Sequence, residues 1–122
     1  MVPEKLVVQL RGRAETCQSS KAGTYILQST DVNGKKHWLA ENSNNAIWYF
    51  ADSQSKNARW MIGLKKNLGK NLGGIFSPDD TATPYEATTW IPEVTTSKMT
   101  FQELSFINDN DVIVAPILNG KN

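Results

Sequence analysis

The sequence predicts an all-β fold, a small and mostly antiparallel barrel or sandwich of seven to nine short strands. Short apolar runs recur along the chain and are separated by Gly, Asn, Asp and Pro, the pattern of many short strands in one sheet-built domain. The spacing of 3.6 residues that marks long amphipathic helices is not found. At 122 residues the chain has the length of one domain, and we expect residues 1–122 to form it.

Each expected strand is an apolar or β-branched run bounded by turn residues. In chain order these runs are 6–10, 24–28, 36–40, 46–51, 59–64, 75–77 and 112–115. The Asn33-Gly34 pair joins the second run to the third, and Asn-Gly favours positive φ at both central residues of a type I′ hairpin turn. The run 46–51 is continuously apolar, which indicates a strand covered on both faces.

Two stretches in the last third of the chain are ambiguous. Around 85–94, Pro84 and Pro92 cannot donate ladder hydrogen bonds, which favours a sheet edge or irregular chain. The spacing over 101–107 fits either a short helical face or a strand.

The core is expected to contain Leu27, Trp48, Phe50, Trp60, Ile62, Ile75 and Val114.

Composition narrows the function classes. Thirteen basic and twelve acidic residues give a net charge of +1, so no field of one sign is expected, which argues against a dedicated nucleic-acid binder. No stretch approaches the ~20 apolar residues needed to span a bilayer. Cys17 is the only cysteine, so no disulfide forms within the chain. This favours a cytoplasmic protein or a domain excised from a longer one, with an extracellular location left open.

Residues that carry catalysis or bind metals are sparse. His37 is the only histidine, and strand alternation places its side chain on the opposite face of the strand from Trp38. We therefore expect His37 to face solvent if Trp38 is buried. One histidine and one cysteine, far apart in the sequence, lack the spacing of a zinc site. The pair Asp79-Asp80 is more typical of solvated turns than of calcium ligands. We therefore assign no catalytic residue, no metal ligand and no cofactor.

The expected ligand site combines a cationic loop with an exposed aromatic residue. Loop 65–74 is rich in glycine, and its lysines are Lys65, Lys66 and Lys70. Trp90 follows threonines in irregular chain, so we expect its indole to be partly exposed, with Tyr85 nearby. Because loops on a rigid sheet concentrate binding residues, we predict an aromatic floor of Trp90 and Tyr85 inside a lysine rim. Such a site would suit an acidic sugar or an acidic peptide segment.

The aromatic and glycine motifs also follow a recognisable order. They are Gly23-Thr24-Tyr25, Asn33-Gly34, Ile47-Trp48-Tyr49, Trp60-Met61-Ile62-Gly63, Gly74-Ile75-Phe76-Ser77, Pro84 and Trp90. This order, over about residues 17–91, resembles a small β module repeated in large proteins of cnidarians, molluscs and some protists. That module has no established activity, and its occurrence in multidomain proteins implies adhesion or binding. The sequence departs from it in having Trp38 where a tyrosine is usual.

These observations favour a non-catalytic binding module for a glycan, peptide or protein partner. The alternative is a structural subunit of a larger assembly that uses edge strands and Trp90 as its contact surface. A third hypothesis is a small hydrolase or isomerase with carboxylates such as Asp52 and Glu86, because small barrels carry enzymes as well as binding proteins. Oligomeric state and ligand identity are left open.

Overall fold

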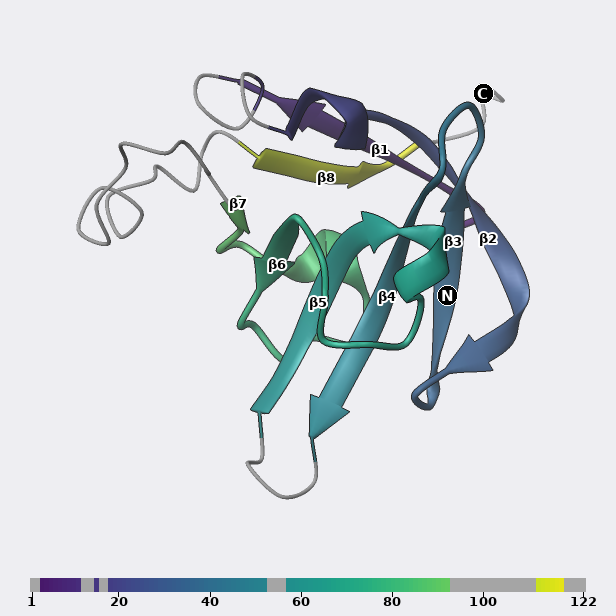
Figure 1. Ribbon diagram of the computed structural model, residues 1–122, viewed down its shortest axis with the longest axis vertical. Coiled ribbons are helices and arrows are strands. Elements are labelled where there is room, and N and C mark those ends of the chain that lie inside the picture. Colours follow the sequence, from purple (N-terminus) through teal and green to yellow (C-terminus); the bar gives the residue numbers. More distant parts are fainter. Residues whose placement is uncertain (1–2, 12–14, 16–17, 53–56, 93–111, 118–122) are drawn as a thin grey trace.

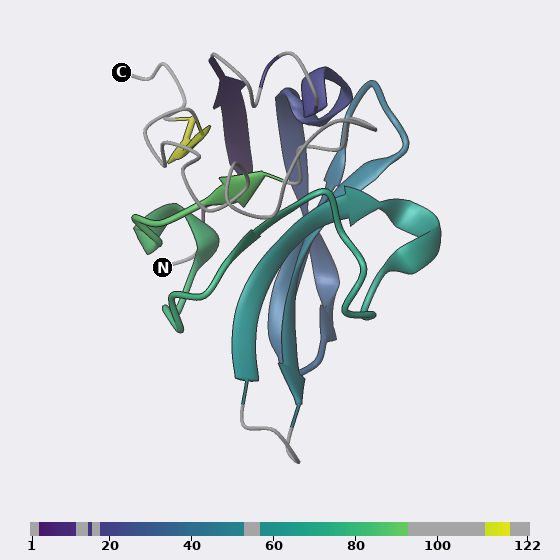
Figure 2. The same cartoon turned by 60° about the vertical axis from the view of Figure 1, so that its left-hand side comes forward.

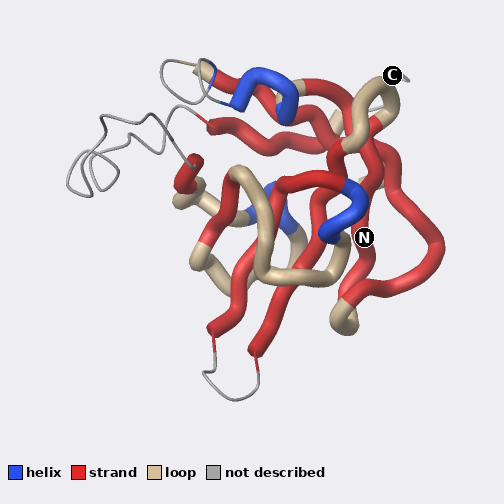
Figure 3. Tube along the Cα trace, in the orientation of Figure 1, coloured by secondary structure: helices blue, strands red, loops and turns tan. Residues whose placement is uncertain are grey.

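The computed structural model describes residues 3–11, 15, 18–52, 57–92 and 112–117, and it confirms the all-β class. The strands of this region form one antiparallel sheet that curls strongly into a half-barrel (Figure 1). The strands are β1 Lys5–Leu10, β2 Gly23–Val32, β3 Lys35–Ala40, β4 Asn45–Asp52, β5 Asn57–Leu64, β6 Ile75–Ser77, β7 Ile91–Pro92 and β8 Val112–Pro116. Three short 3-10 turns accompany them: η1 Ser19–Lys21, η2 Lys65–Asn67 and η3 Pro84–Glu86 (Figure 3). No helix among the described residues is long and apolar enough to cross a membrane.

The sheet is an up-and-down meander with one return. Its order is β7-β6-β5-β4-β3-β2-β1-β8, so each strand pairs with its neighbour in sequence until β8 returns to pair with β1. Figure 2 shows the long strands β2 to β5 curving together while β1 and β8 lie at one end of the curl. The turn η3 contacts β8, so the chain between β6 and β7 helps to close the open side of the half-barrel.

The inner face of the sheet holds the main core. Trp60 lies at its centre, with its ring 6.2 Å from Trp38 and 5.3 Å from Tyr49, both in edge-on contact. The edge-on geometry directs positive ring edges at negative ring faces, which stabilises aromatic pairs beyond their buried area. The Trp60 Nε1–H donates to Thr81 O (3.1 Å) and the Trp38 Nε1–H to Pro3 O (3.0 Å), so neither indole is buried with an unpaired donor.

The outer face carries a second, smaller apolar cluster. Ala46 and Trp48 of β4 lie beside Met61 of β5, and all three are buried. Part of the cover comes from Leu68, which belongs to the loop between β5 and β6. Because β4 is covered on both sides, Ile47 faces the inner core while Trp48 is fully buried on the opposite face. This confirms the two-sided cover expected for the run 46–51.

The predicted core is largely confirmed. Trp48, Trp60, Ile62, Ile75 and Val114 are buried, whereas Leu27 and Phe50 are partly buried and pack against the two clusters. The Asn33-Gly34 turn has the expected positive φ at both residues, 55° and 88°. Pro92 lies in the two-residue edge strand β7, as the proline argument indicated. The ambiguous stretch 101–107 lies outside the described residues.

Strand alternation gave a wrong expectation for His37. Both Trp38 and His37 are buried, although they face opposite sides of β3. The pairing of β2 with β3 shifts between Leu27 and Asp31, so β2 places residues 28–30 opposite the single residue His37. This bulge brings Thr30 O to 3.1 Å from His37 Nδ1 and covers the ring. Burial lowers the pKa of His37, although the Thr30 carbonyl and the Asp31 charge act in the opposite direction.

Candidate ligand-binding groove

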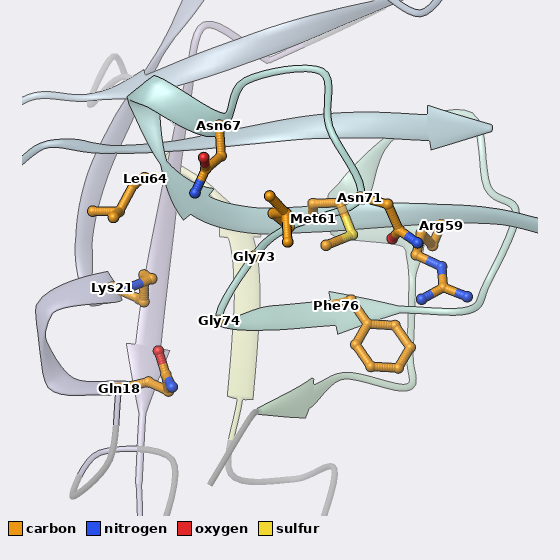
Figure 4. Close-up of a pocket in the computed structure, with 11 residues that line it drawn as sticks. Gln18, Lys21, Arg59, Met61, Leu64, Asn67, Asn71, Gly73, Gly74 and Phe76 are labelled. Atoms are coloured by element: carbon orange, nitrogen blue, oxygen red, sulfur yellow. The ribbon is translucent and has the colours of Figure 1, made fainter. Parts of the chain in front are cut away.

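A hollow on the outer face lies over β5 and β6. We call it the outer groove. Its volume is about 520 Å³, within the range of ligand sites, and Figure 4 shows the side chains that line it. Its lining residues are Gln18, Lys21, Arg59, Met61, Leu64, Asn67, Asn71, Leu72, Gly73, Gly74 and Phe76. Carboxamides and cations therefore surround an apolar floor that includes Met61 and Phe76.

The loop that forms one wall of the groove is tied to the sheet at several points. Trp48 Nε1–H donates to Lys70 O (2.9 Å), and Asn33 Nδ2–H donates to Gly69 O (3.1 Å). At its end, Gly74 N–H donates to Ile62 O (2.9 Å). These bonds fix the loop against the neighbouring strands, so Asn67 and Asn71 are presented from an anchored backbone.

Close packing of two glycines brings the loop onto β5. A Cβ built on Gly63 would lie 2.7 Å from the Cα of Gly73, a distance that side-chain-bearing residues do not tolerate. A Cβ on Gly73 would in turn lie 2.9 Å from Cε of Met61. Glycine at both positions therefore allows the loop to return across the strand, and the groove lies beside that crossing.

Arg59 and Phe76 form one end of the groove. The guanidinium carbon lies 4.7 Å from the ring centroid of Phe76, a cation–π contact that orients the side chain. Figure 4 shows both side chains at the end of the groove beside Asn71. The Nε atom of Arg59 is buried and has no hydrogen-bond partner among the described residues. A buried donor that lacks an acceptor is costly.

Gln18 and Lys21 form the opposite end (Figure 4). Their short segment is fixed to the sheet, because Tyr25 Oη–H donates to Lys21 O (2.6 Å) and Asn45 Nδ2–H donates to Ser20 O (2.6 Å). Burial raises the pKa of the Tyr25 hydroxyl well above its usual range, so it stays a hydrogen-bond donor at neutral pH. The groove thus has a cation and a carboxamide at each end, Arg59 with Asn71 and Lys21 with Gln18, and Asn67 lies between them (Figure 4).

The predicted ligand site is divided between opposite faces of the sheet. Trp90 is 1% exposed and lies in the inner core, so the expectation that it is partly exposed is wrong. The reason is that Ile91 pairs with Phe76 and that Asp79 Oδ2 accepts the N–H groups of Thr88 and Thr89, which draws the segment over the inner face. Hydrogen bonds from the backbone N–H groups of Thr89 and Thr88 stabilise the Asp79 carboxylate and lower its pKa.

The other predicted site residues lie in two places. Tyr85 is partly buried and packs against the inner core. Lys65 and Lys66 instead line a second outer hollow of about 400 Å³, together with Asn44 and Leu64. Lys70 lines neither of these two hollows. The aromatic floor and the lysine rim therefore do not form one site.

The acidic residues considered for chemistry mostly make structural hydrogen bonds. Glu86 Oε1 accepts from Thr83 N–H (3.1 Å) and Thr83 Oγ1–H (2.9 Å), which caps η3. Asp80 Oδ1 accepts from the Tyr49 hydroxyl at 2.7 Å. Burial, together with Asp80, raises the pKa of Tyr49 to about 12. The side chain of Asp52 lies outside the described residues, so the hydrolase hypothesis stays a prediction.

Sequence reasoning missed the residues that give the groove its character. These are Gln18, Arg59, Met61, Asn67, Asn71 and Phe76. One available signal was the alternation of β5, since a buried Trp60 requires Arg59 and Met61 to face the other side. Nothing local places Gln18 next to Gly74, because that contact joins segments more than fifty positions apart in the sequence.

Comparisons with protein families, with characterised proteins and with solved structures find no match. The resemblance to the repeated β module therefore stays a prediction.

Proposed function

We propose that this protein is a non-catalytic binding module and that its ligand is polar, carries negative charge and lies in the outer groove. The observation that carries the proposal is Arg59, whose buried Nε has no partner among the described residues while its guanidinium is stacked on Phe76. A planar guanidinium offers paired N–H donors that match the geometry of a carboxylate or a sulfate. Arg59 is therefore assigned as the main contact for the negative charge of the ligand.

The remaining lining supports a ligand that also carries hydroxyl or amide groups. Gln18, Asn67 and Asn71 each bring a carboxamide, which both donates and accepts hydrogen bonds. Met61 and Phe76 provide apolar surface beneath them. A few placed polar groups over an apolar floor, on loops anchored to a sheet, is the usual composition of a ligand site.

Binding can be tested with a glycan array and an acidic-peptide library, followed by calorimetry on the tightest ligand. Arg59→Gln is expected to weaken the binding free energy of that ligand by about 1.5–3 kcal/mol, the contribution of hydrogen bonds to a charged group. The matched control is Lys70→Gln, which removes one positive charge from the loop that forms one wall of the groove but alters no residue that lines the groove. Melting temperatures of both variants monitor folding.

Two results would contradict the proposal. One is a ligand bound equally well by Arg59→Gln and by the unmodified protein. The other is equal weakening by Arg59→Gln and Lys70→Gln, which would indicate general attraction to positive charge rather than a site.

One argument for the alternative function, a structural subunit of a larger assembly, does not hold. Trp90 is buried in the inner core and so does not offer a contact surface. Leu72, which is 56% exposed at the groove, is the apolar residue that would suit a protein partner instead. Light scattering across a range of concentrations separates the alternatives, because a subunit is expected to self-associate and a binding module to stay monomeric.

A further inference from the structure

The second outer hollow continues from the outer groove. We call it the lysine hollow; it is lined by Asn44, Leu64, Lys65 and Lys66. Leu64 lines both hollows, so the two adjoin at this side chain. In Figure 4, Leu64 lies at the Lys21 end of the outer groove, away from Arg59. The two hollows thus follow one another along β5 and into η2.

Positive charge is distributed along this path. Arg59 lies at its beginning and Lys21 further along, while Lys65 and Lys66 follow in the lysine hollow. Extended chain from Arg59 to Lys65 spans about 20 Å, which is longer than one small ligand. No carboxylate among the described residues lines either hollow. The path is therefore a cationic track on a protein whose net charge is only +1.

Strand addition by a peptide does not suit this track. Both strands that underlie the outer groove already have partners on each side, β5 with β4 and β6, and β6 with β5 and β7. A peptide that binds extended to a sheet needs an unpaired strand edge. The polar groups that face the ligand here are side-chain carboxamides and cations instead.

Single-stranded nucleic acid suits the track no better. Its sequence-independent binding uses exposed aromatic faces on which bases stack. The four tryptophans are buried, and the Arg59 guanidinium covers one face of the Phe76 ring. Carboxamides spaced between cations fit a chain that alternates hydroxyl groups with negative charges.

We infer that the ligand is an extended acidic glycan, a linear polysaccharide that carries carboxylate or sulfate groups and runs from the outer groove across Leu64 into the lysine hollow. This inference rests on the proposed function, because it assumes that the outer groove is the ligand site. Arg59 anchors one end of the bound segment, and Lys65 and Lys66 hold the other. Affinity is then expected to rise with chain length until the glycan spans both hollows.

The experiment is a calorimetric series with the whole protein. The probes are heparin and hyaluronan oligosaccharides shorter and longer than about 20 Å, with neutral dextran as the uncharged glycan. The variants are Arg59→Gln, Lys65→Gln with Lys66→Gln, and the control Lys70→Gln. Comparison of heparin with hyaluronan separates sulfate from carboxylate recognition.

Lys66 is exposed, whereas Lys65 is half-buried and its ammonium also donates to Ala40 O (3.3 Å). We expect the paired lysine variant to weaken the long acidic chains by up to about tenfold, the combined effect of two charge contacts near the surface. The same variant is expected to leave the short chains unaffected and to reduce the salt dependence of binding. Arg59→Gln is expected to weaken both lengths, and Lys70→Gln neither.

Each negative result identifies which part of the two proposals is wrong. Unchanged long-chain affinity in the lysine variant, with a loss in Arg59→Gln, would overturn the track and leave the groove as the binding site. Binding of dextran as tightly as heparin would overturn the requirement for negative charge. Equal affinity for single-stranded polyuridylate, with the same response to the variants, would overturn the glycan assignment. Acidic glycans bound unchanged by Arg59→Gln would overturn both proposals.

Discussion

The two faces of β5 serve different purposes although they alternate along a single strand. On the inner face, Trp60 and Ile62 are fully buried in a core to which β1 to β6 and β8 contribute. On the outer face, Met61 is buried but Arg59 is only partly covered, and the surface above them is the outer groove. The inner face is closed by the curl of the sheet, whereas the outer face is covered only in part, by one loop and by neighbouring side chains of the strands.

This difference shows how a small sheet can combine stability with an open site. Curling brings distant strands together, so inner side chains fill the enclosed space and leave little room for a ligand. On the outer face, Leu68 of one loop covers part of the cluster around Trp48, and a hollow lies beside it. Substitutions on the inner face are therefore expected to change folding, and substitutions at the groove to change binding.

The largest effect is expected for Trp60→Ala. The side chain is fully buried and contacts two other aromatic rings, so its removal leaves a large cavity in the inner core. We expect a loss of about 3–5 kcal/mol in the free energy of unfolding, measured by urea denaturation. Arg59→Gln, on the adjacent outward position, is expected to lose far less. Similar losses for the two variants would contradict the division between faces.

A smaller effect is expected for Gly63→Ala, which tests the contact between loop and strand. The added Cβ would meet the backbone of Gly73, which cannot move without displacing the loop. We expect a loss of about 1–3 kcal/mol in unfolding free energy, typical of overpacking.

Gly74→Ala is the matched comparison for that substitution. Its Cβ would meet Oε1 of Gln18 and Cε of Lys21, which are the ends of flexible side chains. We therefore expect a smaller stability change than for Gly63→Ala, together with weaker binding in the groove. If Gly74→Ala proved the more destabilising of the two, the assignment of Gly63 and Gly73 as the tight crossing would be wrong.

The smallest effect concerns the pH dependence contributed by His37. Burial holds its pKa below the ordinary 6.5, so the unfolded chain takes up a proton first as the pH falls. The free energy of unfolding is expected to decrease on acidification from about pH 7 to about pH 5, and the contribution is fully present above the unfolded pKa.

His37→Asn provides the control for this titration, because it retains an N–H donor towards Thr30 O and removes the chain's single histidine. Denaturation midpoints measured across this pH range should fall less steeply in the variant. Identical slopes would show that His37 does not titrate differently in the two states.

Local sequence patterns were sufficient for the elements of the fold. Asn33-Gly34 specified its turn because few other residues accept positive φ, and the unbroken apolar run 46–51 specified a strand covered on both faces. Pro92 indicated a sheet edge because it lacks an N–H group. Each of these inferences depends on the backbone chemistry of a few adjacent residues.

The placement of side chains on one surface or the other required the tertiary structure. Irregular chain around Trp90 suggested exposure, but pairing of Ile91 with Phe76 carries the indole into the inner core. Alternation predicted an exposed His37, but a bulge in β2 covers it. In both cases the deciding contact comes from a segment elsewhere in the chain, which local periodicity does not encode.

The sequence by itself determined an all-β domain, its turns and most of its core, because alternation and turn chemistry act over neighbouring residues. Only the tertiary structure decided where a ligand could lie. The outer groove brings Gln18 and Lys21 together with Arg59 and the loop 65–74, and its shape depends on how closely Gly73 approaches Gly63. Such a site arises from the curl of the sheet and the path of one loop, which are properties of the packed chain rather than of any segment.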